Sequence, residues 1–566
     1  MKKGYGILCV WLSVWFMQSH AQDIQTIRKQ QPFRIKGTLS AGMWLYNTSG
    51  IANRRQPFSW YLTGSPSVTI YGVTFPFTLT VSEQERRFTQ PFNRYGVSPY
   101  YKWLTIHAGY RNVKFSDFTL AGVSMLGGGF EMNPGKLRLG VMVGRINRAV
   151  AEDSVLADGK VYNAYPVYKR MGYGLKIGYG KPNNYIDLSF FKGYDDYRSI
   201  ARPIRNTRVT PADNAVLGLK THVTLLKHLT LDADVAMSAF TRNLYASSLD
   251  STTLNTQLSF LKGVPAILEV NSSTGLYQAM RGSLSYGFAN GSIAARYERI
   301  DQDFQSLGSF FFNTDNEQWT LTPSFSFFEN FISISGSYGV AHDNLNGKKY
   351  ATTFRSIGAL NLGLQLTDEL NASLSVSNFG TNQNRGLGDL FNDTTAISIV
   401  NSSYALNASY NKADQYQSHS VNLSAGYQNA NDQNRFTRDL TNVSSLYANL
   451  SYTLLAIEQE SNASLTLTYN NTQTPTQRIV TLGPSLSVGI PFLDKALRPV
   501  LSGSYYLRRA DGASDGSTLS VNGTVSYRIE KQTFSVGGSL LHNSSYTSLT
   551  PSFTETRLNV TYGYSF

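Results

Sequence analysis

The feature that most constrains this chain is a strict alternation of apolar and polar residues, which is clearest at its end. From position 558 onward, every second residue is apolar: Leu558, Val560, Tyr562, Tyr564 and Phe566. Successive side chains of a strand point to opposite faces, so one face suits an apolar environment and the other suits water. The same alternation returns at 137–143, 229–237, 370–376 and 463–469. The pattern predicts an all-β protein.

The connections between these segments distinguish a membrane barrel from a soluble sandwich, whose strands also alternate. Short turn sequences lie near 133–135, 181–184, 290–291, 329–330, 367–369 and 530–531. Longer polar stretches lie between them, at 47–56, 114–126, 148–168, 197–213, 242–273, 381–398 and 430–441. Connections that alternate between short and long along the chain are typical of outer-membrane barrels. We therefore predict a single closed antiparallel transmembrane β-barrel of about 24–26 strands, with both termini on the periplasmic side.

The composition agrees with a membrane barrel. Charged residues make up only 15% of the chain, and Tyr and Phe number 35 and 31. A soluble domain usually carries about a quarter charged residues. The mean hydropathy is nevertheless −0.23, which fits a wall in which only alternate residues meet lipid. We expect the protein in the outer membrane, in contact with lipid and lipopolysaccharide.

The first residues have the form of a secretion signal. Lys2 and Lys3 precede an apolar run at 5–17, and small residues at Ser19 and Ala21 follow. The run is shorter than the roughly 20 residues of a spanning helix, which disfavours the alternative of a membrane anchor. We expect a signal peptide at 1–21, a short periplasmic lead at 22–32 and the barrel at 33–566. Cys9, the only cysteine, lies inside the signal, so the mature chain is expected to have no thiol.

Two neighbouring stretches resemble a known group of proteins. These are Gln90–Gly122 (QPFNRYGVSPYYKWLTIHAGYRNVKFSDFTLAG) and Met132–Val150 (MNPGKLRLGVMVGRINRAV). They resemble the N-terminal part of a family of uncharacterised outer-membrane barrels from Bacteroidetes. The resemblance covers about a fifth of the chain. It implies a location and a lineage, and it brings no activity or functional residue with it.

The positive charge is concentrated near the start of the barrel. Residues 28–170 hold 19 Lys or Arg against 7 Asp or Glu, whereas residues 171–566 hold 29 of each. Strand parity predicts that His107, Arg111 and Arg138 point into the lumen as a basic stripe. Such a stripe would attract anions or an acidic partner surface. Alternatively, the cations, above all those near the outer rim at Arg86, Arg87, Arg94 and Arg148, bind lipopolysaccharide or solvate the wall.

The sequence offers little for catalysis. Only six histidines remain after residue 21, and His342 and Asp343 point to opposite faces if they lie on one strand. The acidic stretches at 343–347 and 511–515 lack the bidentate acid of a calcium loop. We predict no enzyme activity, no metal site, no cofactor and no nucleic-acid partner.

Size and loops suggest the function. Roughly 26 tilted strands close into a cylinder about 50 Å across, which needs closing to prevent leakage. The loop at 242–273 carries two apolar pieces, 258–261 and 264–268, and we expect it to fold inward. Our first hypothesis is a barrel that threads, anchors or assembles a partner polypeptide at the cell surface, its lumen closed by loops or by that partner. The alternative is a porin-like solute channel with an anion bias.

The C-terminal strand suggests a further partner. Tyr562, Tyr564 and Phe566 lie on the apolar face of the last strand and end at the chain terminus. They resemble the recognition signal read by the barrel assembly machinery. We therefore predict that these three residues form the assembly signal.

Overall fold

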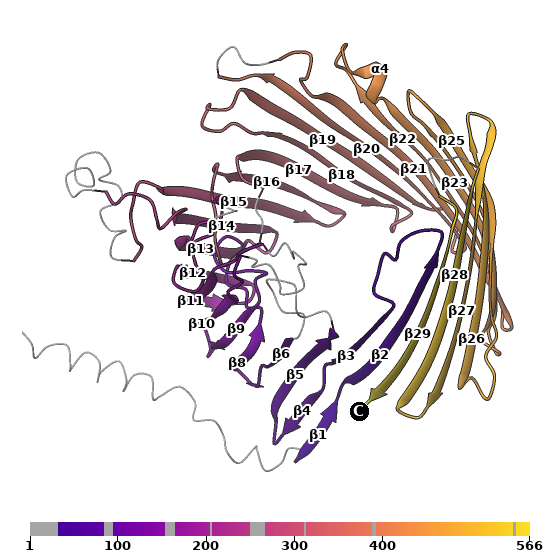
Figure 1. Ribbon diagram of the computed structural model, residues 1–566, viewed down its shortest axis with the longest axis horizontal. Coiled ribbons are helices and arrows are strands. Elements are labelled where there is room, and N and C mark those ends of the chain that lie inside the picture. The colour runs from indigo at the N-terminus through magenta and orange to yellow at the C-terminus, as the bar shows by residue number, and fades with distance from the viewer. Residues whose placement is uncertain are drawn as a thin grey trace, which may run out of the picture.

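The structure is a computed structural model, and it forms one large antiparallel sheet that closes on itself (Figure 1). It describes residues 32–83, 94–152, 165–203, 207–249, 267–310, 313–387, 392–546 and 551–566. The signal peptide and almost all of the lead that we predicted at 1–32 lie outside these residues. Among the described residues, no helix is long and apolar enough to cross a membrane.

The strands follow one another along the chain, with one short helix near a loop. Their bounds are β1 (Phe33–Lys36), β2 (Thr38–Ser49), β3 (Phe58–Gly64), β4 (Ser67–Ile70), β5 (Val73–Ser82), β6 (Arg94–Val97), β7 (Tyr100–Tyr101), β8 (Leu104–Arg111), β9 (Met125–Met132), β10 (Leu137–Asn147), β11 (Lys169–Lys181), β12 (Asn184–Asp196), β13 (Asp213–Leu225), β14 (Leu229–Thr241), β15 (Thr274–Phe288), β16 (Gly291–Ile300), β17 (Asn316–Phe327), β18 (Ile332–His342), β19 (Ala351–Gln365), β20 (Leu370–Arg385), β21 (Ser398–Ala413), β22 (Gln417–Asp432), α4 (Arg438–Thr441), β23 (Val443–Ala456), β24 (Ser461–Gln473), β25 (Arg478–Gly489), β26 (Leu497–Ala510), β27 (Ala513–Ile529), β28 (Gln532–Ser545) and β29 (Phe553–Ser565).

Three wall strands are each interrupted at a glycine or a proline, where the regular strand geometry breaks. Gly37, at φ 121°, separates β1 from β2, while Pro66 separates β3 from β4 and Pro99 separates β6 from β7. Proline has no N–H to donate, and a positive φ favours glycine. β5 pairs with both halves of its two neighbouring strands. The 29 strand segments therefore form a wall of 26 strands, as the sequence predicted.

The last strand closes the barrel onto the first. β29 pairs with β2 in antiparallel register from Ser565 opposite Thr38 to Thr554 opposite Ser49. The backbone N–H of Phe566 then donates to the carbonyl oxygen of Gly37 at 2.9 Å. Because closure leaves no free sheet edge, every strand has two partners. The predicted fold class, a single closed antiparallel barrel, is confirmed.

Short and long connections lie at opposite ends of the barrel. Short turns join β9 to β10, β11 to β12 and each later pair up to β27 and β28, and the chain ends beside them. We call this the turn end. The opposite loop end carries most of the longer connections, including 112–124 between β8 and β9 and 301–315 between β16 and β17, although only two residues join β26 to β27 there. From β8 to β23 this arrangement confirms the alternation that the sequence predicted.

The outward face is an apolar belt. Leu175, Leu188 and Leu217 share one face of neighbouring strands and are 41%, 49% and 52% exposed. Exposed leucines in register over many strands have no place in water, whereas lipid solvates them. A closed antiparallel barrel with such a belt is the form in which chains cross a bacterial outer membrane, and this chain is an outer-membrane β-barrel.

The closing strand generates a first prediction. Tyr562 packs on Phe534 with ring centroids 5.0 Å apart, and Tyr564 packs on Phe566 at 4.9 Å. Changing Tyr562, Tyr564 and Phe566 to Ser should lower the amount of folded protein in the outer membrane severalfold and raise periplasmic degradation. Heat-modifiable migration of membrane fractions measures this. The same change at Phe327, another outward aromatic near the turn end, is the control. Equal losses at both places would contradict a special signal in β29.

Candidate functional site in the barrel lumen

The connection at 112–124 folds against the inner wall of the barrel. Phe118 and Leu120 are fully buried and Phe115 is 3% exposed, although all three belong to a loop. They join a cluster that includes inward residues of the wall, among them Met142 and Phe191. This cluster is an apolar core inside the barrel, on the side opposite to the lipid belt.

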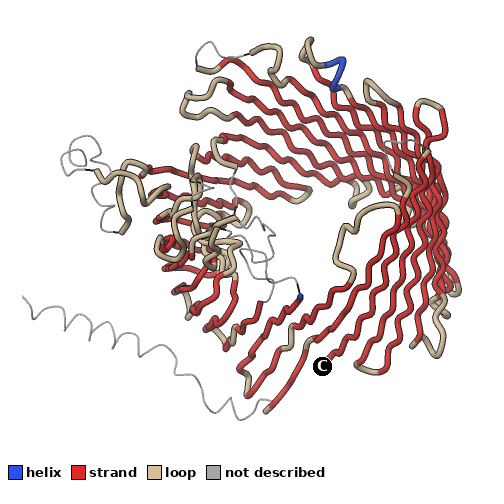
Figure 2. The backbone as a smooth tube through the Cα atoms, in the orientation of Figure 1, coloured by secondary structure: helices blue, strands red, loops and turns tan. Residues whose placement is uncertain are grey.

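A second connection, between β16 and β17, is hydrogen-bonded to the segment 112–124. In the segment 301–310, the hydroxyl of Ser306 donates to the carbonyl oxygen of Thr119 at 2.5 Å, and that of Ser309 donates to the carbonyl oxygen of Asp117 at 2.7 Å. The N–H of Ala121 donates to the carbonyl oxygen of Gly308 at 3.0 Å. We call 112–124 and 301–310 together the inner segments. In Figure 2 they belong to the loops that crowd beside β9 to β14.

Glycines in the wall make room for the inner segments. A Cβ atom on Gly174 would lie 2.7 Å from Leu120 Cδ2, and one on Gly218 would lie 2.6 Å from Thr119 Cγ2. Such distances are too short for carbon atoms in contact, which optimally lie 3.5–4.0 Å apart. The wall and the segments therefore have complementary shapes, and the packing needs glycine at these positions.

Beneath the inner segments, seven positions in cross-strand register form a row on the inner face of β10 to β16. We call it the charged row: Arg138, Gly178, Asp187, Lys220, Asp234, Arg281 and Glu298. Its three cations and three carboxylates alternate in sign. Neighbouring charges therefore attract one another, and the row as a whole carries no net charge.

The start of the row shows how tightly it is built. Arg138 Nε donates to Asp187 Oδ1 at 2.7 Å and Arg138 Nη2 donates to Asp187 Oδ2 at 2.9 Å. The two residues are two strands apart, and Gly178 lies between them. A Cβ atom on Gly178 would lie 1.9 Å from Asp187 Oδ1. The bidentate pair therefore depends on glycine in the intervening strand.

The inner segments bind the far end of the charged row. The hydroxyl of Ser116 donates to Asp234 Oδ1 at 2.6 Å, and Arg281 Nη1 lies 3.2 Å from Asp117 Oδ2. Burial opposes ionisation of Asp117, but its hydrogen bond with Lys114 and the charges of Lys220 and Arg281 outweigh burial. The pKa of Asp117 therefore lies below its ordinary value. A charged Asp117 ties the segment to the wall.

Two of the residues predicted as a basic stripe lie beside carboxylates. Arg138 pairs with Asp187 in the charged row. His107 Nδ1 lies 2.8 Å from the Ser98 hydroxyl, and its Nε2 lies 3.6 Å from Glu131 Oε2. These carboxylates come from β9 and β12, and the basic stripe stays a prediction. Sequence reasoning missed Asp187 because it follows the basic residues 28–170 in the chain, yet it lies beside them in the sheet.

Arg111 completes the predicted set. Its Nη1 donates to the hydroxyl of Thr78 at 3.2 Å and its Nη2 donates to the carbonyl oxygen of Pro76 at 3.2 Å. Both partners lie on β5, so Arg111 reaches across β6 and braces the wall. Of the four predicted rim arginines, Arg86 and Arg87 lie outside the described residues, as does the side chain of Arg94.

The loop predicted to fold inward ends on the opposite face. Its pieces at 258–261 and 264–266 lie outside the described residues. Leu268 is 4% exposed and packs with Ala215 and Ala239, which share the outward parity of the lipid-facing Leu217. This end of the loop covers the outer side of the wall. The apolar residues of 112–124 were the missed signal, because a solvated loop rarely carries Phe115, Phe118 and Leu120.

The other half of the inner wall has a different chemistry. Eight positions in cross-strand register run over β20 to β27, and none is charged. We call them the neutral row: Asn371, Ser409, Asn422, Ser451, Thr466, Ser485, Ser504 and Ser520. Neighbours bond to one another where they can, as when the Ser409 hydroxyl donates to Asn371 Oδ1 at 2.6 Å. The lumen therefore has a charged row under packed loops on one side and a row of uncharged hydroxyl and amide side chains on another.

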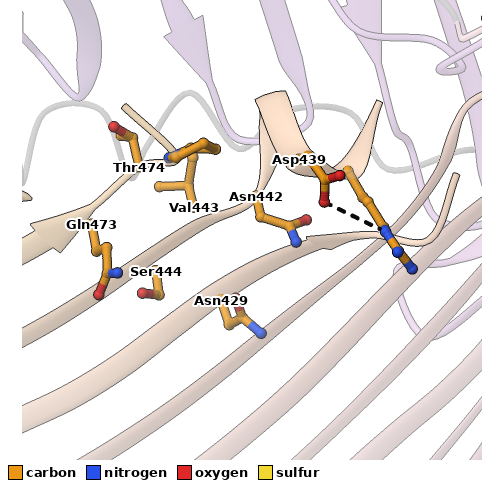
Figure 3. A pocket seen from close by; sticks show the side chains of 9 residues that line it. Asn429, Asp439, Asn442, Val443, Ser444, Gln473 and Thr474 are labelled. Carbon is orange, nitrogen blue, oxygen red and sulfur yellow. Dashed lines mark ion pairs between the residues drawn. The ribbon is translucent and has the colours of Figure 1, made fainter. Parts of the chain in front are cut away.

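A pocket of about 410 Å³ lies at the loop end beside α4 (Figure 3). Asn429, Ser444 and Gln473 line it in cross-strand register, and Asn429 has the outward parity of Tyr427. Arg438 and Asp439 form an ion pair at 3.5 Å at its edge. The pocket therefore belongs to the polar outer rim and not to the lumen. Among the described residues, no three His, Cys, Asp or Glu side chains are grouped to hold a metal ion.

Comparisons with known proteins return large membrane barrels. No family model matches the chain, and no curated protein is similar to it. The translocation pore of the P pilus usher PapC is similar at 11% identity, covering 94% of this chain and 99% of that chain, with a TM-score of 0.35. In the E. coli P pilus tip assembly intermediate PapC-PapD-PapK-PapG, the match covers 93% of this chain and 60% of that chain at 11% identity, with a TM-score of 0.44.

A further outer-membrane protein is among the matches as well. The outer membrane protein OprD from Pseudomonas aeruginosa is 11% identical, covering 69% of this chain and 93% of that chain, with a TM-score of 0.30. Each of these likenesses concerns the arrangement of strands in an outer-membrane barrel.

Proposed function

We propose that this barrel threads and holds a partner polypeptide at the cell surface, with its lumen partly closed by the inner segments. The observation that carries the proposal is the division of the inner wall. One half is covered by packed loops over the charged row, and the other half presents the neutral row. We propose no catalytic activity.

Barrel size supports a polymer as cargo. A wall of 26 strands spaced about 4.8 Å apart and tilted about 40° encloses a cylinder roughly 50 Å across. Barrels of 16–18 strands already leave an aqueous channel for small solutes. A wider barrel whose own loops cover part of its inner wall keeps the diameter of a large pore, and the loops restrict leakage.

The neutral row supports a polypeptide in transit. Ser, Thr and Asn side chains offer donors and acceptors to any passing backbone, and they carry no charge that would hold an acidic or basic side chain. Conduction requires contacts weak enough for the cargo to leave. A wall of small uncharged polar groups meets that requirement for a chain of varied sequence.

The alternative, a solute channel with an anion bias, would use the same lumen. The cations of the charged row are matched by carboxylates, as in the pair of Arg138 with Asp187. The anion bias therefore loses its proposed cause. Size alone favours neither cargo, so the experiments must separate a threaded polypeptide from a solute.

Cross-linking in cells tests the proposal directly. A photoreactive residue at Ser485, on the neutral row, should capture a polypeptide, because cargo would pass within reach of it. The same residue at Leu486, which is adjacent but points outward and is 53% exposed, is the control. Gel shifts followed by mass spectrometry identify the adduct. Capture from both positions, or from neither, would contradict threading.

Displacing the inner segments tests whether they close the pore. Gly218→Val would place atoms where Thr119 now lies, so the segment 112–124 should lift from the wall. Conductance in planar bilayers and uptake of a large glycopeptide antibiotic should both rise. The matched change is Gly523→Val, since a Cβ atom there would meet only Leu501 Cδ1, at 3.7 Å. If the folded Gly218→Val protein has unchanged permeability, the inner segments do not close the pore.

Charge reversal tests the anion-channel alternative. Arg138→Glu would face the buried carboxylate of Asp187, which is 3% exposed. Breaking such a pair should cost about 3–5 kcal/mol of unfolding free energy, measured by urea titration in liposomes. The exchanged pair R138D/D187R should recover most of it, and Lys136→Glu, at an exposed turn, should cost little. A shift toward cation selectivity with unchanged stability would instead favour an anion channel.

A further inference from the structure

A pocket of about 590 Å³ lies at the seam where β29 pairs with β2, and it extends to β3 on the other side of β2. We call it the seam pocket. Trp44, Tyr61 and Arg557 line it from the three strands, and Arg54 and Arg55 line it from the connection between β2 and β3. Its volume is within the range of ordinary ligand pockets, roughly 300–1,000 Å³.

The pocket opens on the lumen side of the wall. Trp44 pairs in register with Asn559 on β29 and Ser59 on β3. These positions alternate with Leu558 and Trp60, which face outward, so Trp44 points inward. The Trp44 side chain is nevertheless 41% exposed. A large aromatic surface on the polar face of a wall is unusual, and such surfaces mark binding sites.

The charges of the seam pocket do not balance. Arg557 Nε donates to Glu555 Oε1 at 2.9 Å, and Arg54 Nη1 lies 3.8 Å from Glu555 Oε2. Glu555 is buried, so two arginines share one enclosed carboxylate. Among the described residues, Arg55 has no ion-pair partner. Counted over the described residues, three cations and one anion leave two positive charges, in contrast to the charged row.

We propose that the seam pocket binds an acidic segment of the polypeptide that passes through the barrel. This proposal rests on the proposed function. Carboxylates of the segment would accept hydrogen bonds from Arg55 and Arg54, and an apolar or aromatic neighbour would lie on Trp44. Charge complementarity argues for this occupant, because the pocket carries the excess positive charge that the charged row lacks. Arginine and tryptophan are also the residues that most often dominate binding energy at protein interfaces.

Binding of a synthetic peptide to the full-length protein in detergent tests the proposal. The probe is a dye-labelled ten-residue peptide with four Asp and two Tyr, and its partner probe has Asn in place of every Asp. Fluorescence anisotropy should show binding of the acidic peptide only, weakening as salt rises. Arg55→Gln and Trp44→Ser should each raise the Kd about tenfold. Neither residue lies in the inner segments or the neutral row.

Matched variants separate binding from folding. Trp319→Ser removes an outward tryptophan of β17 that is 57% exposed, and Arg528→Gln removes an arginine of β27. Neither residue lines the seam pocket. Both should bind like the unchanged protein, and heat-modifiable migration confirms that all variants fold.

Three results would overturn the proposal. They are equal binding of the Asn peptide, equal loss in Trp44→Ser and Trp319→Ser, and tighter binding of an oligo-uronate of the same charge, which would point to an acidic polysaccharide. Because the assay needs no native cargo, peptide binding without a Ser485 adduct would refute threading alone.

Discussion

The alternation of charge along the charged row is the interaction on which the rest of the lumen depends. Three cations and three carboxylates lie on one face of β10 to β16, beneath packed loops. Buried ions are tolerated only when each is paired and hydrogen-bonded. Pairing in turn fixes Gly178, over which Arg138 reaches Asp187, and it gives Ser116 and Asp117 their anchors. The inner segments pack on the charged row and bind to it.

This arrangement makes the barrel asymmetric, and the asymmetry gives the lumen its proposed use. Loops packed on β9 to β16 cover one part of the inner wall, whereas the neutral row on β20 to β27 presents uncharged side chains. The composition shows an excess of positive charge, and this excess does not lie in the charged row. Part of it lies in the seam pocket, beside the strand that closes the barrel.

Strand parity was a good guide to faces and a poor guide to partners. It placed Arg138 on the inner side, where the structure also has it, but it could not show that Asp187 lies two strands away. The same limit applied to the loops. The apolar residues of 242–273 drew attention, while those of 112–124 fill the lumen. The signal peptide, the Bacteroidetes lineage and the C-terminal assembly signal remain predictions.

The sequence by itself determined the strands, their faces, the apolar belt and the closed barrel of about 26 strands, because a period of two is a local property that each segment carries alone. Tertiary structure decided which charges meet and which loop turns inward. Ser116 and Asp234, for example, are 118 residues apart and share a hydrogen bond. Registers between strands and the shape complementarity of Leu120 with Gly174 depend on neighbours that only the closed sheet brings together.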